Sequence, residues 1–195
     1  MSVSTIKLEV GFFLLSKLLQ GHIPTKQANN IVSFTHAAGA TCLNLLLRTN
    51  VINFSVMRNF STGYFIYDVI EMIRSKKVTM MNIGYLYHHL ASIYLLNSSV
   101  NPSLVNKIFF WAELSNLPTY PLYHYLHQKG DHKDKIKKLQ FLQKIVFTVI
   151  RVIIISKMIH RYLKEKEGEN IPKPLLAVLP IYFMGLAWTY KILRQ

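Results

Sequence analysis

Long apolar stretches, each close to the length of a membrane-spanning helix, follow one another along this chain of 195 residues. A helix needs about 20 largely apolar residues to cross the hydrocarbon core of a bilayer. A weaker first stretch covers residues 6–19, and six stronger ones cover residues 31–52, 54–73, 79–96, 104–126, 139–163 and 174–193. Because every backbone polar group in lipid must be paired within the protein, this pattern predicts an all-α, multi-pass transmembrane protein that folds as one helical bundle.

Charged residues are sparse in the chain and gather between the apolar stretches. They make up 16% of the sequence, whereas soluble domains average about a quarter. The Lys and Arg behind the net charge of +14 are densest at residues 74–77, 129–140 and 161–173. Basic residues that flank spans meet anionic lipid head groups. No nucleic-acid-binding motif accompanies them, so we expect no nucleic-acid partner.

The ends of the chain and its single cysteine carry further expectations. With seven spans, Lys and Arg are more numerous on the side that holds the C-terminus, which predicts a cytosolic C-terminus and an N-terminus across the membrane. The first apolar stretch contains Lys17 and no small-residue cleavage pattern, so it is predicted to stay as a helix, spanning or interfacial. Cys42 has no partner for an internal disulfide and is predicted to be a small buried hydrophobe.

Ionisable side chains inside the predicted spans are few. Each is costly in lipid, so by default it faces the bundle interior and is a candidate functional residue. The set consists of His36, Asp68, Glu71, His88, His89, Glu113, His124, Lys144, Arg151 and Lys157. Arg151 and Lys157 are predicted instead to snorkel toward lipid head groups from near a span end.

Helical spacing brings several polar residues onto common faces, because residues three or four apart in a helix are neighbours. The groups formed in this way are Tyr64 with Asp68 and the nearby Tyr67, Glu113 with Asn116 and Tyr120, and His88 with Ser92. His89 lies about 100° around the helix from His88. At most one of the two histidines is therefore expected to point straight at a given site.

The adjacent histidines have more than one interpretation. Either ring could hydrogen-bond Asp68 or Glu113 across the bundle and serve only to hold the helices together. We expect no metal site, because His88 and His89 are not four residues apart and no Cys or His set completes a group of ligands.

Five segments of the chain, taken in order, resemble the TLC domain family, which includes translocon-associated TRAM proteins and ceramide synthases. They are "IVSFTHAAGAT", "GYFIYDVIEM", "YLYHHLASIYLL", "AELSNLPTYPLYHYL" and "YFMGLAWTYKILR". The resemblance covers residues 30–194 and implies a six-helix membrane barrel around a lipid-accommodating cavity, here with one additional N-terminal helix. It divides the chain into an N-terminal helix and linker at residues 1–29 and a TLC-type domain at residues 30–195.

The resemblance also implies roles for particular residues. His88 and His89 match the paired histidines that are implicated, in ceramide synthases, in transferring a fatty acyl group from coenzyme A to a sphingoid amine. Asp68 and Glu113 match acidic residues of the family, and these four form the predicted catalytic set. A neutral imidazole can take a proton from the attacking group or accept the acyl group itself, while an acid fixes its tautomer. The predicted lipid- or substrate-binding residues are His36, Tyr64, Tyr67, Ser92, Asn116 and Tyr120.

One departure from the family pattern keeps the function open. Ceramide synthases carry a His-Asp-x-x-Asp motif where this chain has "AELSN", so that Ala112, Glu113 and Asn116 replace its three functional residues. The chain therefore looks closer to short TLC-domain proteins associated with membrane phospholipid composition. Three functions remain: acyl transfer from acyl-CoA, as co-substrate rather than bound cofactor, to a lipid acceptor; non-catalytic lipid binding that senses or regulates membrane composition; and a cargo or translocon accessory role. An endoplasmic reticulum location is expected for each.

Overall fold

The computed structural model describes residues 3–74, 80–128, 130–165 and 170–194, and these residues form helices and short connections without any strand. The helices are α1 (Val3–Gln20), α2 (Thr25–Arg48), α3 (Phe54–Arg74), α4 (Met80–Leu96), α5 (Pro102–Asn116), α6 (Thr119–Leu126), α7 (Lys133–Phe147), the π-helical η1 (Thr148–Ile154), α8 (Ile155–Glu165) and α9 (Lys173–Leu193). The predicted start of a span at Thr79 and parts of the three basic groups lie outside the described residues.

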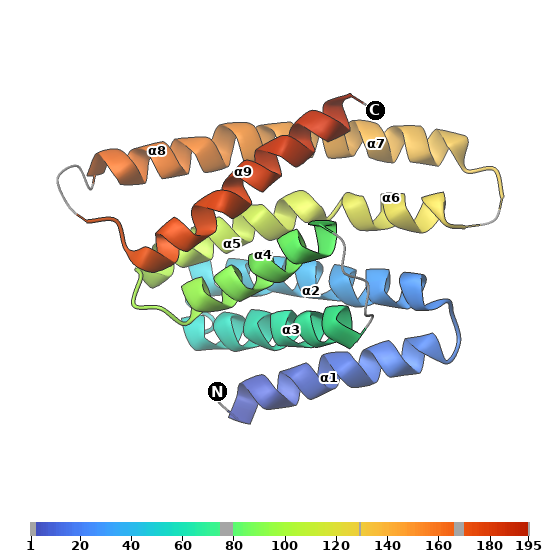
Figure 1. Ribbon diagram of the computed structural model, residues 1–195, viewed down its shortest axis with the longest axis horizontal. Coiled ribbons are helices and arrows are strands. Elements are labelled where there is room, and N and C mark those ends of the chain that lie inside the picture. Colours follow the sequence, from blue (N-terminus) through green and yellow to red (C-terminus); the bar gives the residue numbers. More distant parts are fainter. Residues whose placement is uncertain (1–2, 75–79, 129, 166–169, 195) are drawn as a thin grey trace.

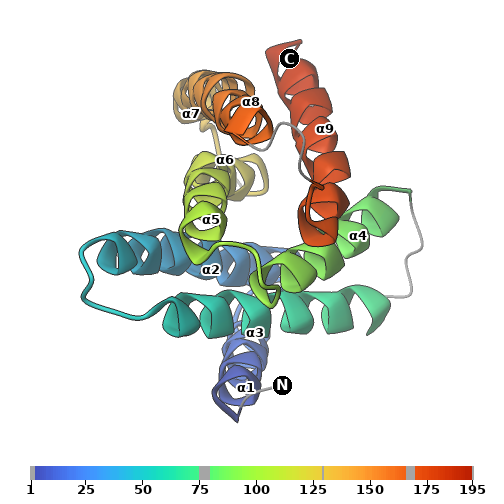
Figure 2. The ribbon, with the colours of Figure 1, turned by 90° about the vertical axis from the view of Figure 1, so that its left-hand side faces the viewer.

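The helices pack in a continuous order. α2 contacts α3 and α5, α3 contacts α4, α4 contacts α9, and η1 contacts both α5 and α9. Figure 1 shows α7, η1 and α8 as one long helix that α9 crosses diagonally. In the view along the long axis, α2 and α3 lie between α1 on one side and α5, α8 and α9 on the other (Figure 2). The polar site described below lies among the helices of this order.

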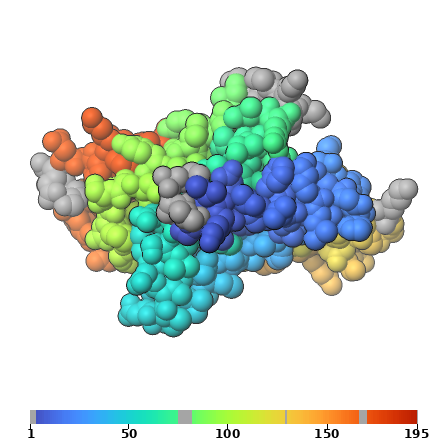
Figure 3. Space-filling model, turned by 90° about the horizontal axis from the view of Figure 1, so that it is seen from below, coloured from blue at the N-terminus to red at the C-terminus, as the bar shows by residue number. Residues whose placement is uncertain are grey.

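Helix α1 lies on the outside of this arrangement. It packs against α3 and, less extensively, α2, and Figure 3 shows it across the face that looks away from α9. Gly63 of α3 permits this contact, because a Cβ there would come 3.0 Å from the backbone nitrogen of Glu9 and 3.0 Å from Cβ of Leu8. Small residues let helices approach closely in this way.

Three helical segments of the described chain are long and apolar enough to cross a membrane, namely Thr25–Arg48, Lys133–Glu165 and Lys173–Leu193. Large apolar side chains also face outward, with Leu18 65% exposed, Phe141 67% and Phe183 62%. An outer surface of this kind suits lipid rather than water. The chain is accordingly an all-helical membrane protein, as the sequence predicts.

The structure corrects three details of the sequence-based expectations. The predicted span at residues 104–126 is broken into α5 and α6 at Leu117 and Pro118, because proline lacks an amide hydrogen and its ring clashes with the preceding turn. The predicted span at residues 139–163 belongs to a longer helix that begins at Lys133 and contains a π-helical turn. Cys42, predicted to be buried, is exposed.

Candidate functional site

Most of the predicted site residues line one polar cavity. From α2, α3 and α4 come His36, Tyr64, Asp68, His88 and His89, and from α5 and α6 come Glu113, Asn116 and Tyr120. The cavity has an empty volume of about 2160 Å³, including its open part. Five helices thus bring eight of the ten predicted residues to one place, where their side chains can hydrogen-bond and exchange protons.

His89 and Asp68 form the closest acid–imidazole pair of this polar cavity. The distance from Nε2 of His89 to Oδ2 of Asp68 is 2.8 Å, and the pair links α4 to α3. The Nδ1 atom of His89 is buried and has no hydrogen-bond partner within the described part of the chain. In a neutral ring that donates Nε2–H to the carboxylate, Nδ1 carries the lone pair. The pair therefore has the geometry of an imidazole base whose tautomer is held by an acid.

His36 and Glu113 make a second, looser pair. Nδ1 of His36 is 4.0 Å from Oε2 of Glu113, and Nδ2 of Asn116 donates to the same oxygen over 3.4 Å. The His36 ring is stacked on Tyr64 with 3.9 Å between centroids, and the Tyr64 hydroxyl donates to Oγ of Ser33 over 2.9 Å. Stacking and burial fix the His36 ring, which is 1% exposed, firmly within the wall.

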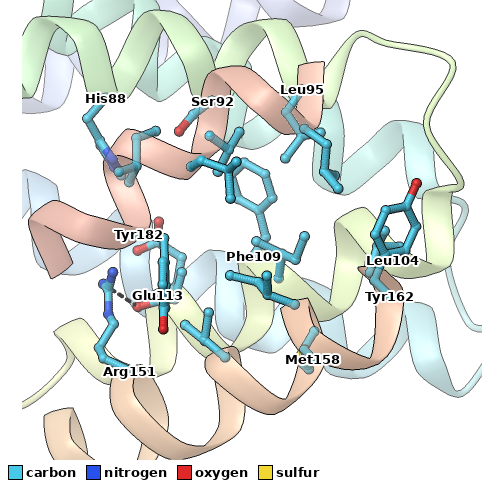
Figure 4. A pocket seen from close by; sticks show the side chains of 18 of the residues that line it. His88, Ser92, Leu95, Leu104, Phe109, Glu113, Arg151, Met158, Tyr162 and Tyr182 are labelled. Carbon is cyan, nitrogen blue, oxygen red and sulfur yellow. Dashed lines mark hydrogen bonds between the residues drawn. The ribbon is translucent and has the colours of Figure 1, made fainter. Parts of the chain in front are cut away.

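His88 occupies the boundary between the polar cavity and a second hollow. The second, the apolar hollow, has an empty volume of about 1070 Å³, including its open part, and is lined mainly by α4, α5, α8 and α9. Five residues line both spaces: Phe65, His88, Glu113, Arg151 and Ile181. Figure 4 shows His88, Glu113 and Arg151 at one end of the apolar hollow and Leu104, Met158 and Tyr162 toward the other. The adjacent histidines thus serve different surfaces: His88 faces both spaces, whereas His89 faces the polar cavity.

Two predicted residues lie elsewhere. Ser92 lines the apolar hollow rather than the polar cavity. Tyr67 lines neither of these spaces and is 3% exposed in the apolar core with Phe12 and Phe65. The structure thus places Tyr67 away from the lining of both spaces, and its lipid-binding role stays a prediction. The described residues also contain no group of three or more His, Cys, Asp or Glu placed to hold a metal ion.

Arg151 is the site residue that the sequence interpretation missed. It does not snorkel: its Nε donates to Oγ of Ser115 over 2.7 Å, and its Nη2 donates to the carbonyl of Ala112 over 3.3 Å and to Oδ1 of Asn116 over 3.1 Å. The available signal was its position, 12 residues from either end of the predicted span at 139–163. A side chain at the middle of a span is too deep to reach head groups, so it must find partners inside.

The fold and these two connected spaces define a helical membrane protein with an internal polar site. The TLC domain family model matches residues 26–194, nearly the whole chain, and the protein belongs to the TLC domain family, whose members are membrane proteins related to lipids. Comparison with curated proteins and with solved structures gave no match.

Proposed function

We propose that this protein transfers a fatty acyl group from acyl-CoA to a lipid acceptor, with the acyl chain in the apolar hollow and the reacting groups in the polar cavity. The observation that carries this proposal is the position of His88 at the boundary of the two spaces, next to the His89–Asp68 pair. The ring centroids of the two histidines are 5.3 Å apart. A carbonyl at the end of an apolar chain would lie where both rings can reach it.

The lining of the apolar hollow supports an acyl chain as its occupant. Aliphatic side chains come from four helices, among them Leu95, Ile108, Ile155 and Leu179. Burial of methylene groups there is favourable by about 0.8 kcal/mol each, so the chain supplies binding energy while the head stays in the polar cavity.

The proposed chemistry needs an imidazole that acts as a base and a carboxylate that stabilises the imidazole once it is protonated. A neutral imidazole, at Nδ1 of His89 or on His88, takes the proton from the acceptor amine or hydroxyl as that group attacks the thioester carbonyl. The carbon–sulfur bond breaks, and the imidazolium returns the proton to the departing thiolate of coenzyme A. Asp68 stabilises the imidazolium of His89 between these two transfers. In the covalent variant, His88 attacks the thioester carbonyl, the carbon–sulfur bond breaks and the thiolate of coenzyme A departs. The acceptor then gives its proton to Nδ1 of His89 as it attacks the acyl carbon, and the bond between the acyl group and His88 breaks.

Lipidomics of cells that express the protein tests this proposal. Wild type, His88→Ala, His89→Ala and the control His160→Ala are compared at matched protein levels; His160 is exposed on α8. We expect altered acyl-lipid composition with wild type and His160→Ala, and its loss in both other variants. Lipid changes that persist fully in His88→Ala and His89→Ala rule out histidine-dependent transfer.

A second candidate function is lipid binding without chemistry, as in a sensor or regulator of membrane phospholipid composition. The specific observation in its favour is Ala112, which stands where the family's catalytic motif has a histidine and whose carbonyl accepts a hydrogen bond from Arg151. In this case wild type and the histidine variants co-purify with the same lipid, and all of them produce the same change in cellular lipids. Mass spectrometry of the purified protein identifies that lipid.

We propose in addition a membrane arrangement for the domain. The packing order α2, α3, α4, α9, η1 and α5, in which η1 belongs to one long helix and α6 extends α5, supports the six-helix barrel with α1 outside it. Exposed Lys133, Lys135, Lys137 and Lys138 at the start of α7 suit anionic head groups of the cytosolic leaflet. The C-terminus is proposed to be cytosolic and the membrane that of the endoplasmic reticulum. Glycosylation tags at each terminus test the orientation, and glycosylation of the C-terminal tag contradicts it.

A further inference from the structure

Arg151 brings a positive charge to the boundary between the polar cavity and the apolar hollow. Its side chain lines both spaces and is half-buried. All three of its hydrogen-bond acceptors are neutral: the Ser115 hydroxyl, the Ala112 carbonyl and the Asn116 amide oxygen. Within the described residues it forms no ion pair. A guanidinium charge at this depth lacks a directly bound counter-ion.

The hydrogen bonds of Arg151 leave one end of the guanidinium free to bind. A guanidinium has five N–H groups. One on Nε and two on Nη2 are used by the three neutral acceptors. Both hydrogens of Nη1 remain without a partner in the described part of the chain. The bonded side of the group therefore fixes its orientation, and the Nη1 side is available to a ligand.

Two features of the backbone provide space for this group. Arg151 lies in the π-helical turn η1. Such turns are rare in proteins overall, and those that occur are often found at functional sites. Across from it, Gly185 of α9 has no side chain, and a Cβ there would lie 3.3 Å from Nη1 of Arg151 and 3.6 Å from its Cδ. Both Arg151 and Gly185 line the polar cavity, so the missing side chain keeps Nη1 uncovered.

The other charged groups of the polar cavity have partners of their own. Asp68 is bound by His89 over 2.8 Å, and Glu113 is held by Asn116 over 3.4 Å with His36 at 4.0 Å. Lys191 also lines the cavity and adds positive charge. Glu113 also lies at the boundary, and its carboxylate attracts the Arg151 guanidinium without forming an ion pair with it. An anion that enters from the apolar hollow therefore meets the unbonded Nη1 end of Arg151, while the carboxylates of Asp68 and Glu113 are bound by His89 and Asn116.

We propose that Arg151 forms an anion site at this boundary, which binds the head of a single-chain lipid acid while its hydrocarbon tail fills the apolar hollow. The inference rests on the proposed function in one respect, that the apolar hollow holds an acyl chain. A fatty carboxylate and a monoalkyl phosphate share the required chemistry, an anionic oxygen head on one chain. Because the acyl carbonyl of a thioester would reach the same donors, a bound lipid acid competes with acyl-CoA.

Equilibrium binding to the purified full-length chain in detergent tests this inference. The probes are radiolabelled hexadecanoate, hexadecyl phosphate and hexadecanol at pH 8, and the variants are Arg151→Met and the matched control Lys157→Met, whose lysine is exposed on α8. We expect wild type and Lys157→Met to prefer at least one acid over the alcohol by about tenfold or more, the scale of hydrogen bonds to a charged group. Arg151→Met loses the preference and keeps the alcohol affinity. The preferred acid identifies the head as carboxylate or phosphate.

A second variant guards against simple misfolding of Arg151→Met. Gly185→Ala retains the charge but places a methyl group against Nη1, so it is expected to weaken acid binding while alcohol binding stays unchanged. Equal affinities for acid and alcohol in wild type overturn the anion site but leave the lipid cavity standing. Failure of wild type to bind any of the three probes overturns the acyl-chain hollow itself, and with it the proposed function. An acid preference that survives in both Arg151→Met and Gly185→Ala also overturns the inference.

Discussion

The Nε2 atom of His89 lies 2.8 Å from Oδ2 of Asp68, and this contact joins α4 to α3 inside the polar cavity. An acid in this position holds the imidazole in one tautomer and favours its protonated form during a proton transfer. The unpartnered Nδ1 on the other side of the ring is then the atom that acts on a ligand.

Asp68→Asn is expected to reduce histidine-dependent acyl transfer on the order of 100-fold or more, within the range for general acid–base catalysis. The side-chain amide can donate to Nε2, which moves the ring hydrogen to Nδ1 and removes the free base. The measurement is the acyl-lipid product in cells or in reconstituted membranes. Asp131→Asn is the control, because Asp131 is exposed and pairs with Lys133 at the surface. The assignment is contradicted if both variants lose acyl transfer equally, or if neither variant loses it.

His36→Ala is expected to destabilise the fold by about 2 to 4 kcal/mol, the range for truncating a large buried side chain. His36 is 1% exposed and stacks between Tyr64 and Phe60. His36→Phe keeps an aromatic ring in the stack and should cost clearly less, although it loses the contact with Glu113. Thermal unfolding of the purified protein compares the two midpoints. Identical midpoints would mean that stacking does not support the wall of the cavity.

Gly63→Ala and Gly11→Ala form a matched pair that tests the packing of α1. Both changes raise helix propensity by about 0.5 to 1 kcal/mol. A Cβ at Gly11 meets no atom within 4 Å, whereas one at Gly63 comes 3.0 Å from backbone of α1. We expect Gly11→Ala to raise the unfolding midpoint, and Gly63→Ala to lower it through overpacking of about 1 to 3 kcal/mol. Similar midpoints for the two variants would place α1 away from α3.

Leu104→Trp is expected to shorten the acyl chains that the protein retains. Leu104 lines the apolar hollow at the end away from His88 and Arg151 (Figure 4), so a larger side chain there fills part of the space for the tail. Mass spectrometry of lipids that co-purify with the protein measures the chain length. Leu90→Trp is the control, because Leu90 is 52% exposed on α4. An unchanged chain-length distribution in Leu104→Trp contradicts the assignment of the hollow to the tail.

Local spacing predicted much of the polar cavity but not the direction of every side chain. Tyr64 and Asp68 are four residues apart, which leaves them about 40° apart around the helix, and both reach the cavity. Tyr67 lies about 100° from Asp68 on the same helix, and this turns it toward Phe12 of α1. The direction of the Tyr67 side chain depends on how α1 packs against α3. The sequence of residues 54–73 alone does not indicate this packing.

Two irregular helices account for the remaining differences. The apolar run at residues 104–126 has the length of a single span, but Pro118 cannot supply the amide hydrogen that a continuous helix needs. No residue in the apolar run around Arg151 predicts a π-helical turn. The inward direction of Arg151 depends on that turn and on its acceptors Ser115 and Asn116 from α5, which lie 36 and 35 positions away in the sequence. Contacts over such separations are decided by tertiary packing.

The π-helical turn η1 also sets the rotational phase of everything that follows it. A wider turn takes up more chain than an α-helical one, and each extra residue rotates the downstream helix by about 100°. Beyond η1, the residues Ile155, Met158, Ile159 and Tyr162 all line the apolar hollow, with the spacing of one helix face. The local winding that presents Arg151 at the head end thus also aims this stripe at the tail end. Removal of a single residue from η1 would rotate the helix beyond it by about 100° relative to the helix before it and turn the apolar stripe away from the hollow. Recognition of the head by Arg151 and of the tail by the stripe therefore depends on the same π-helical turn.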